Sequence, residues 1–334
     1  MPNIKVMHFG LGPIGAAIVK QVATRPGFKI VGAIDIDPAK VGRDLGDIVG
    51  LSKRIGVKVS GDAAKALKSA KPDVVILCTS SSIKKVLPQI EMILKSKTAI
   101  VSTTEELSYP AYTHIRQARQ IDKLAKKAKV AVLGTGVNPG FAMDALPIAL
   151  TAVCERVDRI FVNRVQDARV RRLPFQQKIG AGLTTEQFQK KKDDGSVRHV
   201  GLTESIAMIA DAMGWTLDRI TDDLEPKLAQ VTISSEFLAV DPGYVCGIIQ
   251  DGVGYRKNEP VIRLHMEAYL GAPESYDSVE IEGSPKISSK ITGGIHGDVA
   301  TASIVVNSIP KVLQAAPGLH TMRDLALPSF FSGR

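Results

Sequence analysis

The chain has 334 residues, of which 44% are hydrophobic and 23% charged, as is typical of a globular protein with two domains. Its net charge of +9 does not indicate a nucleic-acid partner, because the basic residues are spread along predicted helices, as in Lys190–Lys192, without interleaved aromatic side chains. We expect instead a solvated basic surface around sites for anionic small molecules. Three scattered cysteines argue against a disulfide framework or a zinc site and favour the cytoplasm, and no apolar run is long enough to span a membrane.

The first predicted elements are a buried strand, Ile4–Phe9, and a helix that begins after a turn with the pattern G-x-G-x-x-G. In such a turn Gly10 permits the tight bend, Gly12 lets a pyrophosphate approach the backbone, and Gly15 lets the helix pack against the strand. The helix N-terminus offers N–H groups and a partial positive charge to the phosphates. The segment therefore predicts a dinucleotide-binding turn.

A second apolar run, Ile30–Ile34, ends on Asp35. An acid at this position can accept hydrogen bonds from both hydroxyls of an adenosine ribose. Its charge would repel the 2′-phosphate of NADP, but Lys40 and Arg43 follow closely, so the sequence allows NAD or NADP as the cofactor. The cofactor-binding residues predicted in this segment are Gly10, Gly12, Pro13, Ile14, Gly15 and Asp35.

Further strands and helices alternate along the first part of the chain. The predicted strands are Val57–Val59, Asp73–Cys78, Ala99–Val101 and Val130–Leu133, and a long helix is predicted from Pro110 to about Lys127. This alternation predicts an α/β Rossmann domain with a doubly wound parallel sheet. Ligands of such sheets bind beyond the carboxyl ends of the strands, so we expect Thr79, Ser80, Ser81 and Asn138 to contact the cofactor.

Two adjacent acids, Glu105 and Glu106, follow another strand of the same domain. A carboxylate beside a flat cofactor can hold an ammonium ion or take a proton from water, and partial burial would raise its pKa towards a useful value. The alternative is a pair of solvated acids near the N-terminus of the helix predicted from Pro110, where negative charge is favourable. Position in the sequence does not decide between the two.

The pattern changes in the second part of the chain, where longer alternating strands dominate. Strands are predicted at Arg156–Val165, Ala229–Phe237, Val245–Val253, Val261–Leu270 and Val279–Ile281, with helices at Thr184–Lys192 and Glu204–Met213. They indicate a second α+β domain with an antiparallel sheet. A helix at Asp298–Ile309 is expected to return to the first domain, so we predict a first domain of residues 1–140 completed by 297–334, and a second of residues 141–296.

Basic side chains and histidines of the second part are candidates for substrate binding. Arg171 and Arg172 lie in a basic segment that could bind a substrate carboxylate, form a solvated loop, or contact another subunit. His199 and His296 each lie near glycines. His296 is the better candidate, because the backbone around it can approach a ligand closely.

Seven segments of the chain together resemble the 2,4-diaminopentanoate dehydrogenases and the native amine dehydrogenases, which are relatives of dihydrodipicolinate reductase. The segments are VMHFGLGPIG, VGAIDIDPAKVGRDLG, STTEELSYP, GTGVNPGFAMDALP, RRLPFQQKIGAGLTTEQF, RHVGLTES and GGIHGDVATA. The resemblance implies NAD(P)-dependent oxidative deamination of a primary amine, reversible as reductive amination of a ketone with ammonia. It also implies a homodimer built through the sheet of the second domain.

In this family a glutamate of the EELSYP block handles the amine, which implies Glu105 or Glu106 here. The substrate-binding residues that we predict are Phe141, Arg171, Arg172, His199, His296 and Thr301. The native amine dehydrogenases lack a carboxylate partner in the substrate pocket, so the branch and the exact substrate stay open. There are two alternatives. One is an imine reductase or amino-acid dehydrogenase of the same fold, although the histidine-and-lysine motif of dihydrodipicolinate reductase is absent. The other is a non-catalytic dinucleotide-binding protein.

Overall fold

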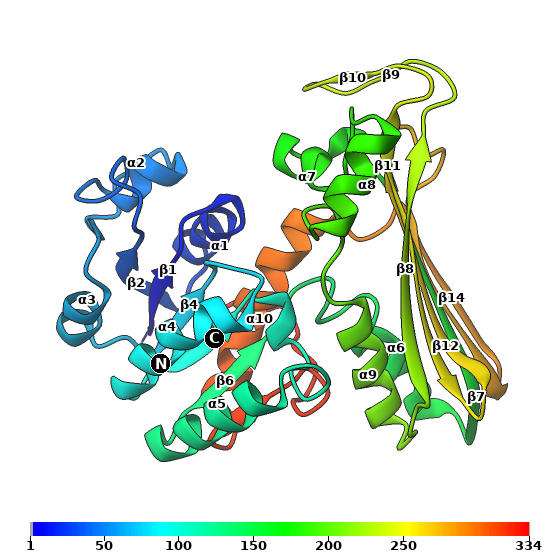
Figure 1. Cartoon of the computed structure of the whole chain (residues 1–334). Coiled ribbons are helices and arrows are strands. Elements are labelled where there is room, and N and C mark those ends of the chain that lie inside the picture. Colours follow the sequence, from blue (N-terminus) through cyan, green and yellow to red (C-terminus); the bar gives the residue numbers. More distant parts are fainter. Residues whose placement is uncertain (1–2, 334) are drawn as a thin grey trace. The chain divides into compact units, whose positions relative to one another are not determined.

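The computed structural model describes residues 3–333, which divide into two compact units (Figure 1). The first unit contains residues 3–141 and 296–333, and the second contains residues 142–295. In the described part of the chain, no helix is long and apolar enough to cross a membrane.

A parallel sheet forms the centre of the first unit. Within residues 3–333 it has seven strands in the order β15-β6-β5-β4-β1-β2-β3. These are β1 (Ile4–Phe9), β2 (Phe28–Ile34), β3 (Val59–Ser60), β4 (Val74–Leu77), β5 (Ala99–Ser102), β6 (Ala131–Gly134) and β15 (Gly318–His320). Every strand pair is parallel, so the carboxyl ends share one edge of the sheet. The strand order reverses between β1 and β4, and this is the point at which doubly wound folds bind their ligands.

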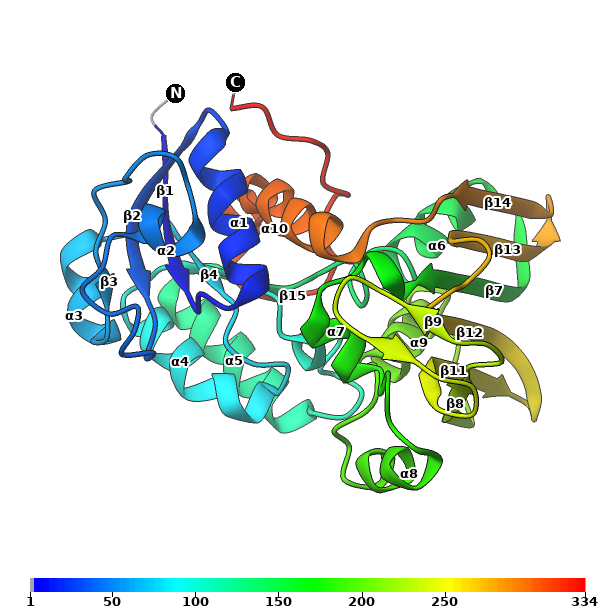
Figure 2. The ribbon, with the colours of Figure 1, turned by 90° about the horizontal axis from the view of Figure 1, so that it is seen from above.

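Helices cover both faces of this sheet, as Figure 2 shows. They are α1 (Pro13–Thr24), α2 (Leu45–Val49), α3 (Ala63–Ala70), α4 (Ile83–Lys95), α5 (Ile115–Ala128) and α10 (Gly297–Gln314). Helices α1 and α10 lie side by side, joined by a 3.0 Å hydrogen bond from Gln21 Nε2 to Ser303 Oγ. Helices α3, α4 and α5 pack on the other face, around Met7 and Phe9. The predicted doubly wound α/β fold is confirmed.

One predicted helix of the first unit begins at the wrong residue. The helix expected from Pro110 is α5, which begins at Ile115. The chain turns between Glu105 and His114 instead, starting with the 3-10 helix η1 (Glu105–Leu107), and the His114 N–H donates to the Pro110 carbonyl at 2.9 Å. The acids at 105 and 106 therefore do not precede a helix that begins at Pro110. The short third strand is also shifted, from the predicted Val57–Val59 to Val59–Ser60.

The second unit is built on a mixed sheet. In the described residues it has six strands in the order β14-β13-β7-β12-β11-β8. They are β7 (Arg156–Asp167), β8 (Arg219–Leu228), β11 (Val245–Arg256), β12 (Glu259–Tyr269), β13 (Tyr276–Ser284) and β14 (Ile287–Thr292), while β9 (Ile233–Ser234) and β10 (Ala239–Val240) pair separately. The helical segments are α6 (Ala145–Leu150), α7 (Leu173–Lys178), α8 (Thr185–Asp193) and α9 (Leu202–Ala212), with the 3-10 turns η2 (Thr151–Val153) and η3 (Ala168–Val170).

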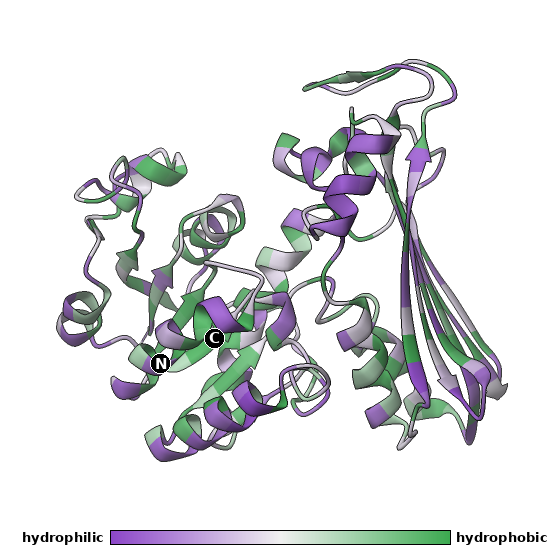
Figure 3. Ribbon diagram, viewed as in Figure 1, coloured by the Kyte–Doolittle hydropathy of each residue, from purple (hydrophilic) through white to green (hydrophobic). Residues whose placement is uncertain are grey.

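Helix α9 packs closely on one face of this mixed sheet, which we call the inner face (Figure 1). Two glycines of β11 permit the approach, because a Cβ at Gly252 or Gly254 would lie 2.8 Å from a side-chain carbon of Ile206. Figure 3 shows mainly hydrophilic residues along α8, where Lys190–Lys192 are exposed. These lysines supply part of the positive charge of the chain.

One strand prediction for the second sheet is wrong. The strand expected at Ala229–Phe237 is largely loop, and the chain forms β8 at Arg219–Leu228 instead. Pro226 lies within β8, which is tolerated because β8 is an edge strand and needs no donor on its free side. The predicted second α+β unit with its antiparallel sheet is confirmed, with one parallel strand pair among the antiparallel ones. Strand β7 is inserted between the consecutive strands β12 and β13, which run in opposite directions, so its pairing with β12 is parallel.

Candidate active site

The three glycines of the turn after β1 have different structural roles. Gly10 has a φ of +95°, and a Cβ there would lie 2.6 Å from the Cys78 carbonyl oxygen. A Cβ at Gly15 would lie 2.1 Å from the Gly10 carbonyl oxygen. Gly12 has a φ of −68°, which any residue adopts, and a Cβ there would meet no atom within 4 Å. The protein itself does not need a glycine at position 12, and the open space there fits a ligand that approaches the backbone.

The N-terminus of α1 faces the same turn. Gly12 is the N-cap residue, no side chain caps the helix, and Pro13 occupies its first turn. The N–H groups of a helix N-terminus together with the helix dipole favour a bound anion. Pro13 is exposed and Ile14 is half-buried. The turn thus has the form expected of a pyrophosphate site.

Asp35 follows the end of β2 and is held in a fixed orientation. Its carboxylate accepts hydrogen bonds from the Leu11 N–H at 2.8 Å and the Asp37 N–H at 2.9 Å, and Lys40 Nζ lies 3.4 Å away. Burial alone would raise the pKa of Asp35, but these hydrogen bonds and the Lys40 charge outweigh it and lower the pKa. The next residue, Ile36, is 86% exposed. An ionised acid beside an exposed apolar side chain suits an adenosine, whose ribose needs acceptors and whose base is flat and apolar.

The loop after β4 is tied to the loop after β5. The Thr104 hydroxyl donates to the Ser80 carbonyl at 2.8 Å, and the Glu106 N–H donates to the Ser81 carbonyl at 3.2 Å. The Thr79 hydroxyl, which is predicted to contact the cofactor, donates to Gln89 on α4 at 2.6 Å. These bonds hold the two loops together at the carboxyl edge of the sheet.

The adjacent acids Glu105 and Glu106 have different surroundings. Glu106 Oε2 accepts the N–H of Ile83 at 2.8 Å, at the N-terminus of α4, and lies 3.1 Å from His114 Nε2. The negative charge of Glu105 instead affects the pKa of the Cys78 thiol. Burial raises the pKa of the Cys78 thiol to about 12, and the Glu105 charge adds to that rise. The Glu105 charge is thus close enough to Cys78 to act on its thiol, while the Glu106 carboxylate stabilises the N-terminus of α4.

The segment after β6 contains Asn138, which is half-buried, as is Phe141. Within this segment Gly140 has a φ of +125°, and a Cβ there would lie 2.4 Å from the Gly136 nitrogen. The Val137 N–H donates to Thr301 Oγ1 on α10 at 3.3 Å. Asn138 and Thr301 are therefore brought together at the carboxyl edge of the first sheet, although they are far apart in the sequence.

His296 is exposed and is the N-cap residue of α10, where its Nδ1 accepts the Val299 N–H at 3.5 Å. This capping contact accounts for the histidine without a ligand. Its predicted role in substrate binding stays a prediction.

The other predicted substrate residues belong to the second unit. Arg171 is only 6% exposed, its Nη1 donates to Gln166 Oε1 at 2.9 Å, and its guanidinium lies 4.0 Å from the Phe175 ring centroid. A solvated loop would not bury this side chain, so that alternative does not describe Arg171. Arg172 is the half-buried N-cap residue of α7. His199 is also half-buried, with its backbone held by the side chain of Gln250.

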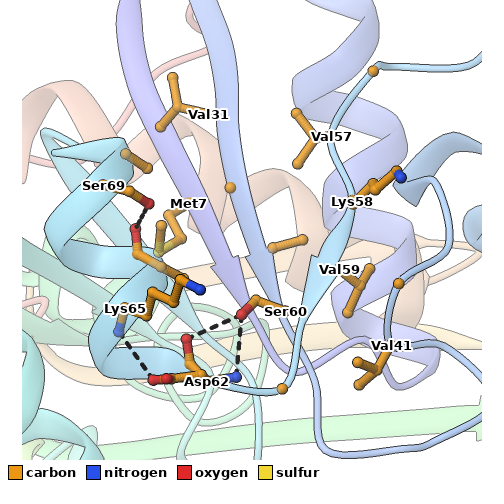
Figure 4. A pocket seen from close by; sticks show the side chains of 17 residues that line it. Met7, Val31, Val41, Val57, Lys58, Val59, Ser60, Asp62, Lys65 and Ser69 are labelled. Atoms are coloured by element: carbon orange, nitrogen blue, oxygen red, sulfur yellow. Dashed lines mark hydrogen bonds between the residues drawn. The ribbon is translucent and has the colours of Figure 1, made fainter.

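A cavity of about 630 Å³ lies beside β2, β3 and α3 in the first unit (Figure 4). Its walls are mixed, with the apolar side chains of Val31, Val57 and Val59 beside the charged side chains of Lys58, Asp62 and Lys65. Neither the glycine turn nor Glu105 contributes to its lining. We therefore do not assign the chemistry to this cavity.

The sequence interpretation missed residues that support the site from behind. Cys78 limits the turn through its carbonyl, and Gln250 holds the backbone of His199 in the second unit. Arg164, which the sequence places in the same basic segment as Arg171, is buried and pairs with Asp277. No local pattern marks Gln250 or Cys78.

Comparison with known proteins identifies the family. Residues 4–135 match the family model described as dihydrodipicolinate reductase, N-terminus, and residues 141–334 match the 2,4-diaminopentanoate dehydrogenase C-terminal domain. A curated 2,4-diaminopentanoate dehydrogenase from Acetoanaerobium sticklandii is 34% identical over 340 residues, covering 100% of this chain and 96% of that protein. This chain belongs to the 2,4-diaminopentanoate dehydrogenase family.

Members of neighbouring groups extend the comparison. A curated amine dehydrogenase from Streptomyces virginiae is 24% identical over 97% of this chain and 96% of its own length. The solved structure of the amine dehydrogenase from Mycobacterium smegmatis has a TM-score of 0.87 at 25% identity and covers 98% of each chain. A dihydrodipicolinate reductase from a Paenisporosarcina species shares the fold, with a TM-score of 0.54 at 15% identity. The family resemblance is confirmed, and the chain is an NAD(P)-dependent oxidoreductase that acts on amines.

Proposed function

We propose that this chain catalyses the oxidative deamination of a primary amine such as 2,4-diaminopentanoate, and the reductive amination of the corresponding ketone with ammonia in reverse. The observation that carries the proposal is Gly12, whose backbone tolerates a side chain and whose surroundings leave open space before the N-terminus of α1. A dinucleotide pyrophosphate accounts for a glycine there, and the family accounts for the amine.

The first unit would hold the cofactor. Gly10, Gly12 and Gly15 shape the turn for the pyrophosphate, and Asp35 would accept the adenosine ribose hydroxyls. Further cofactor contacts would come from Pro13, Ile14, Thr79, Ser80, Ser81 and Asn138. The nicotinamide, when bound, supplies the hydride acceptor or donor for the reaction.

Glu105 is the better candidate for the carboxylate that handles the amine. The Glu106 carboxylate accepts the Ile83 N–H at the α4 N-terminus and lies against His114, which gives it a structural role, while the charge of Glu105 reaches the Cys78 thiol beside the glycine turn. Glu105 would hold the substrate ammonium, stabilise the positive charge that develops at the imine carbon, and then take a proton from the attacking water. Positioning the amine carbon supplies a further part of the rate.

The second unit would bind the substrate and form the dimer. Figure 1 shows α6 and α9 on the inner face of its sheet and, in the described residues of this unit, no helix on the outer face. That outer face contains half-buried apolar residues, including Phe161, Ile249 and Val253. We propose that a second copy covers it, making a homodimer, and that the enzyme works in the cytoplasm on a free amine or ketone and ammonia.

The test of function is a panel of amines with NAD or NADP, followed by absorbance of the reduced cofactor and by release of ammonia. The proposal expects both products in equal amounts with at least one primary amine. Reduction of cofactor by a cyclic imine or a hydroxy acid, with none from any amine, would contradict it. Tight cofactor binding without turnover of any substrate would support the dinucleotide-binding alternative instead.

A further inference from the structure

The two adjacent acids lie in the short 3-10 turn η1 with Leu107. A 3-10 helix has roughly three residues per turn, so consecutive side chains point in directions about 120° apart. Leu107 is 0% exposed and packs in the core of the first unit. Gly134 at the end of β6 permits this packing, because a Cβ there would lie 2.5 Å from the Leu107 carbonyl oxygen. One of the three directions of the turn is therefore fixed by the core.

Glu106 fixes the second direction of the turn. Its N–H donates to the Ser81 carbonyl at 3.2 Å, and its Oε2 accepts the Ile83 N–H at 2.8 Å. Ser82 is the N-cap residue of α4 but makes no side-chain capping bond, so the Glu106 carboxylate acts as the cap of this helix. With Leu107 and Glu106 both held, the direction in which the third side chain, Glu105, leaves the turn is also determined.

His114 is a further contact of the Glu106 carboxylate. Its Nε2 lies 3.1 Å from Glu106 Oε2, and the exposed fractions of the two side chains are 16% and 18%. His114 is the N-cap residue of α5, yet its side chain makes no capping hydrogen bond to that helix. Capping therefore does not account for the ring, whereas the contact with Glu106 does. A hydrogen bond to an ionised carboxylate is roughly twice as strong as one between neutral groups, so this contact adds to the hold on Glu106.

We propose that His114 is a positioning residue for the reaction, because its hydrogen bond to Glu106 fixes the turn η1 and thereby orients Glu105 towards the amine. This inference rests on the proposed function, in which Glu105 handles the amine. A displacement of about 1 Å between reacting groups can slow a reaction about 100-fold, so a turn held less firmly would lower the rate of the chemical step. The bonds from Thr104 to the Ser80 carbonyl and from Thr79 to Gln89 do not involve His114, so the loop after β4 should keep its place.

The first test compares kcat for deamination of the best amine of the panel in the wild type, His114→Leu and His114→Gln. His114→Leu removes the donor and should lower kcat about tenfold, while the KM of the amine and the affinity for NAD(P)H change less than about threefold. His114→Gln carries an amide N–H that can donate to the same carboxylate, so its kcat should lie within about threefold of the wild type. His320→Leu is the matched control, because it removes another half-buried histidine of the first unit, whose ring contacts the Ala316 carbonyl.

A second test asks whether His114 acts through Glu105. In Glu105→Gln the carboxylate that handles the amine is absent, so its orientation no longer matters. Adding His114→Leu to this variant should therefore lower the residual kcat less than about twofold. A purely structural role of His114 would lower kcat by the same factor in both backgrounds.

Three results would overturn the inference while leaving amine dehydrogenation intact. They are an unchanged kcat in His114→Leu, a loss that His114→Gln does not restore, and a further tenfold loss in the double variant. A normal kcat in Glu105→Gln overturns it together with the assignment of Glu105. If the wild type oxidises no amine, the proposed function fails, and crystal structures of the wild type and His114→Leu then test the positioning by itself. Glu105 should point in a different direction in the variant, and an identical turn in both proteins would overturn the inference.

Discussion

The carboxyl edge of the first sheet, where we propose that the cofactor binds, and the inner face of the second sheet, where we propose that the substrate binds, are built by different means. At the edge of the first sheet the backbone forms the site, because glycines shape a turn before a helix terminus and Gly12 leaves its side-chain position empty. On the inner face of the second sheet the site consists of side chains, because Arg171 and His199 come from separate loops and are held by glutamines on β7 and β11. Backbone sites are encoded locally in the sequence, whereas side-chain sites depend on strand pairing.

Substitution of the two adjacent acids should give the largest effect, because we propose that Glu105 handles the amine at the carboxyl edge of the first sheet. Glu105→Gln keeps the size but removes the proton acceptor, so kcat for deamination should fall about 10²- to 10⁴-fold. Glu106→Gln retains an acceptor for the Ile83 N–H and should keep near-normal kcat with a small loss of stability. Steady-state kinetics on both, with cofactor binding measured as a control, checks this. A loss confined to Glu106→Gln would reverse the assignment.

The glycine turn can be tested by contrasting two of its positions. Gly12→Val should fold normally, because the backbone and the space accept a side chain, but it should weaken NAD(P)H binding at least about 100-fold by displacing the pyrophosphate from its N–H donors. Gly10→Ala should instead lower the unfolding free energy by about 1–3 kcal/mol, because its Cβ meets the Cys78 carbonyl. Fluorescence titration and thermal melts separate the two outcomes. Unchanged affinity in a folded Gly12→Val protein would remove the basis of the cofactor assignment.

Each unit also contains a histidine whose pKa is strongly lowered, which allows a comparison of the acid stability of the two units. Burial lowers the pKa of His8 on β1, and that of His199, to about 3. Below pH 6.5 the unfolded chain takes up protons that the folded chain does not, so stability present above that pH is lost as the pH falls towards 3. The loss is about 1.4 kcal/mol per pH unit for each histidine.

Urea unfolding at pH 7 and pH 5 measures that slope for the wild type, His8→Leu and His199→Phe. Each variant should show a shallower pH dependence than the wild type in this window. Identical pH slopes in the wild type and both variants would show that these histidines are not neutral in the folded protein.

Substitutions at Asp35 and Lys40 should change the preference between NAD and NADP by smaller factors than the changes above. Asp35→Asn removes a charge that opposes a 2′-phosphate and should shift the kcat/KM preference about tenfold towards NADP. Lys40→Met removes the cation 3.4 Å from Asp35 and should shift it the other way by a few-fold. Parallel kinetics with NAD and NADP measure both. A wild type that strongly prefers NADP would contradict the role given to Asp35.

The local features of the first unit could be predicted because they depend on neighbours in the sequence. The turn, Asp35 and the alternation of strands and helices all follow from short-range patterns, and the doubly wound sheet follows from them. The predictions that failed concern features that depend on contacts between residues far apart in the sequence. Strand β8 carries Pro226 and weak alternation, and the parallel pairing of β7 depends on its insertion between two later strands. The difference between Glu105 and Glu106 likewise depends on Ile83, which is distant in the sequence.

The central claim is that this chain removes hydride from the carbon that bears a primary amine, and isotope transfer tests it most directly. 4-Aminopentanoate carrying deuterium on that carbon is incubated with the enzyme and oxidised NAD or NADP, and the reduced cofactor is analysed by mass spectrometry. The account predicts one deuterium in each reduced cofactor formed, one ammonia released with it, and the loss of both in Glu105→Gln. Reduced cofactor without deuterium, or a cofactor that binds and stays oxidised with this and every other amine offered, would contradict it.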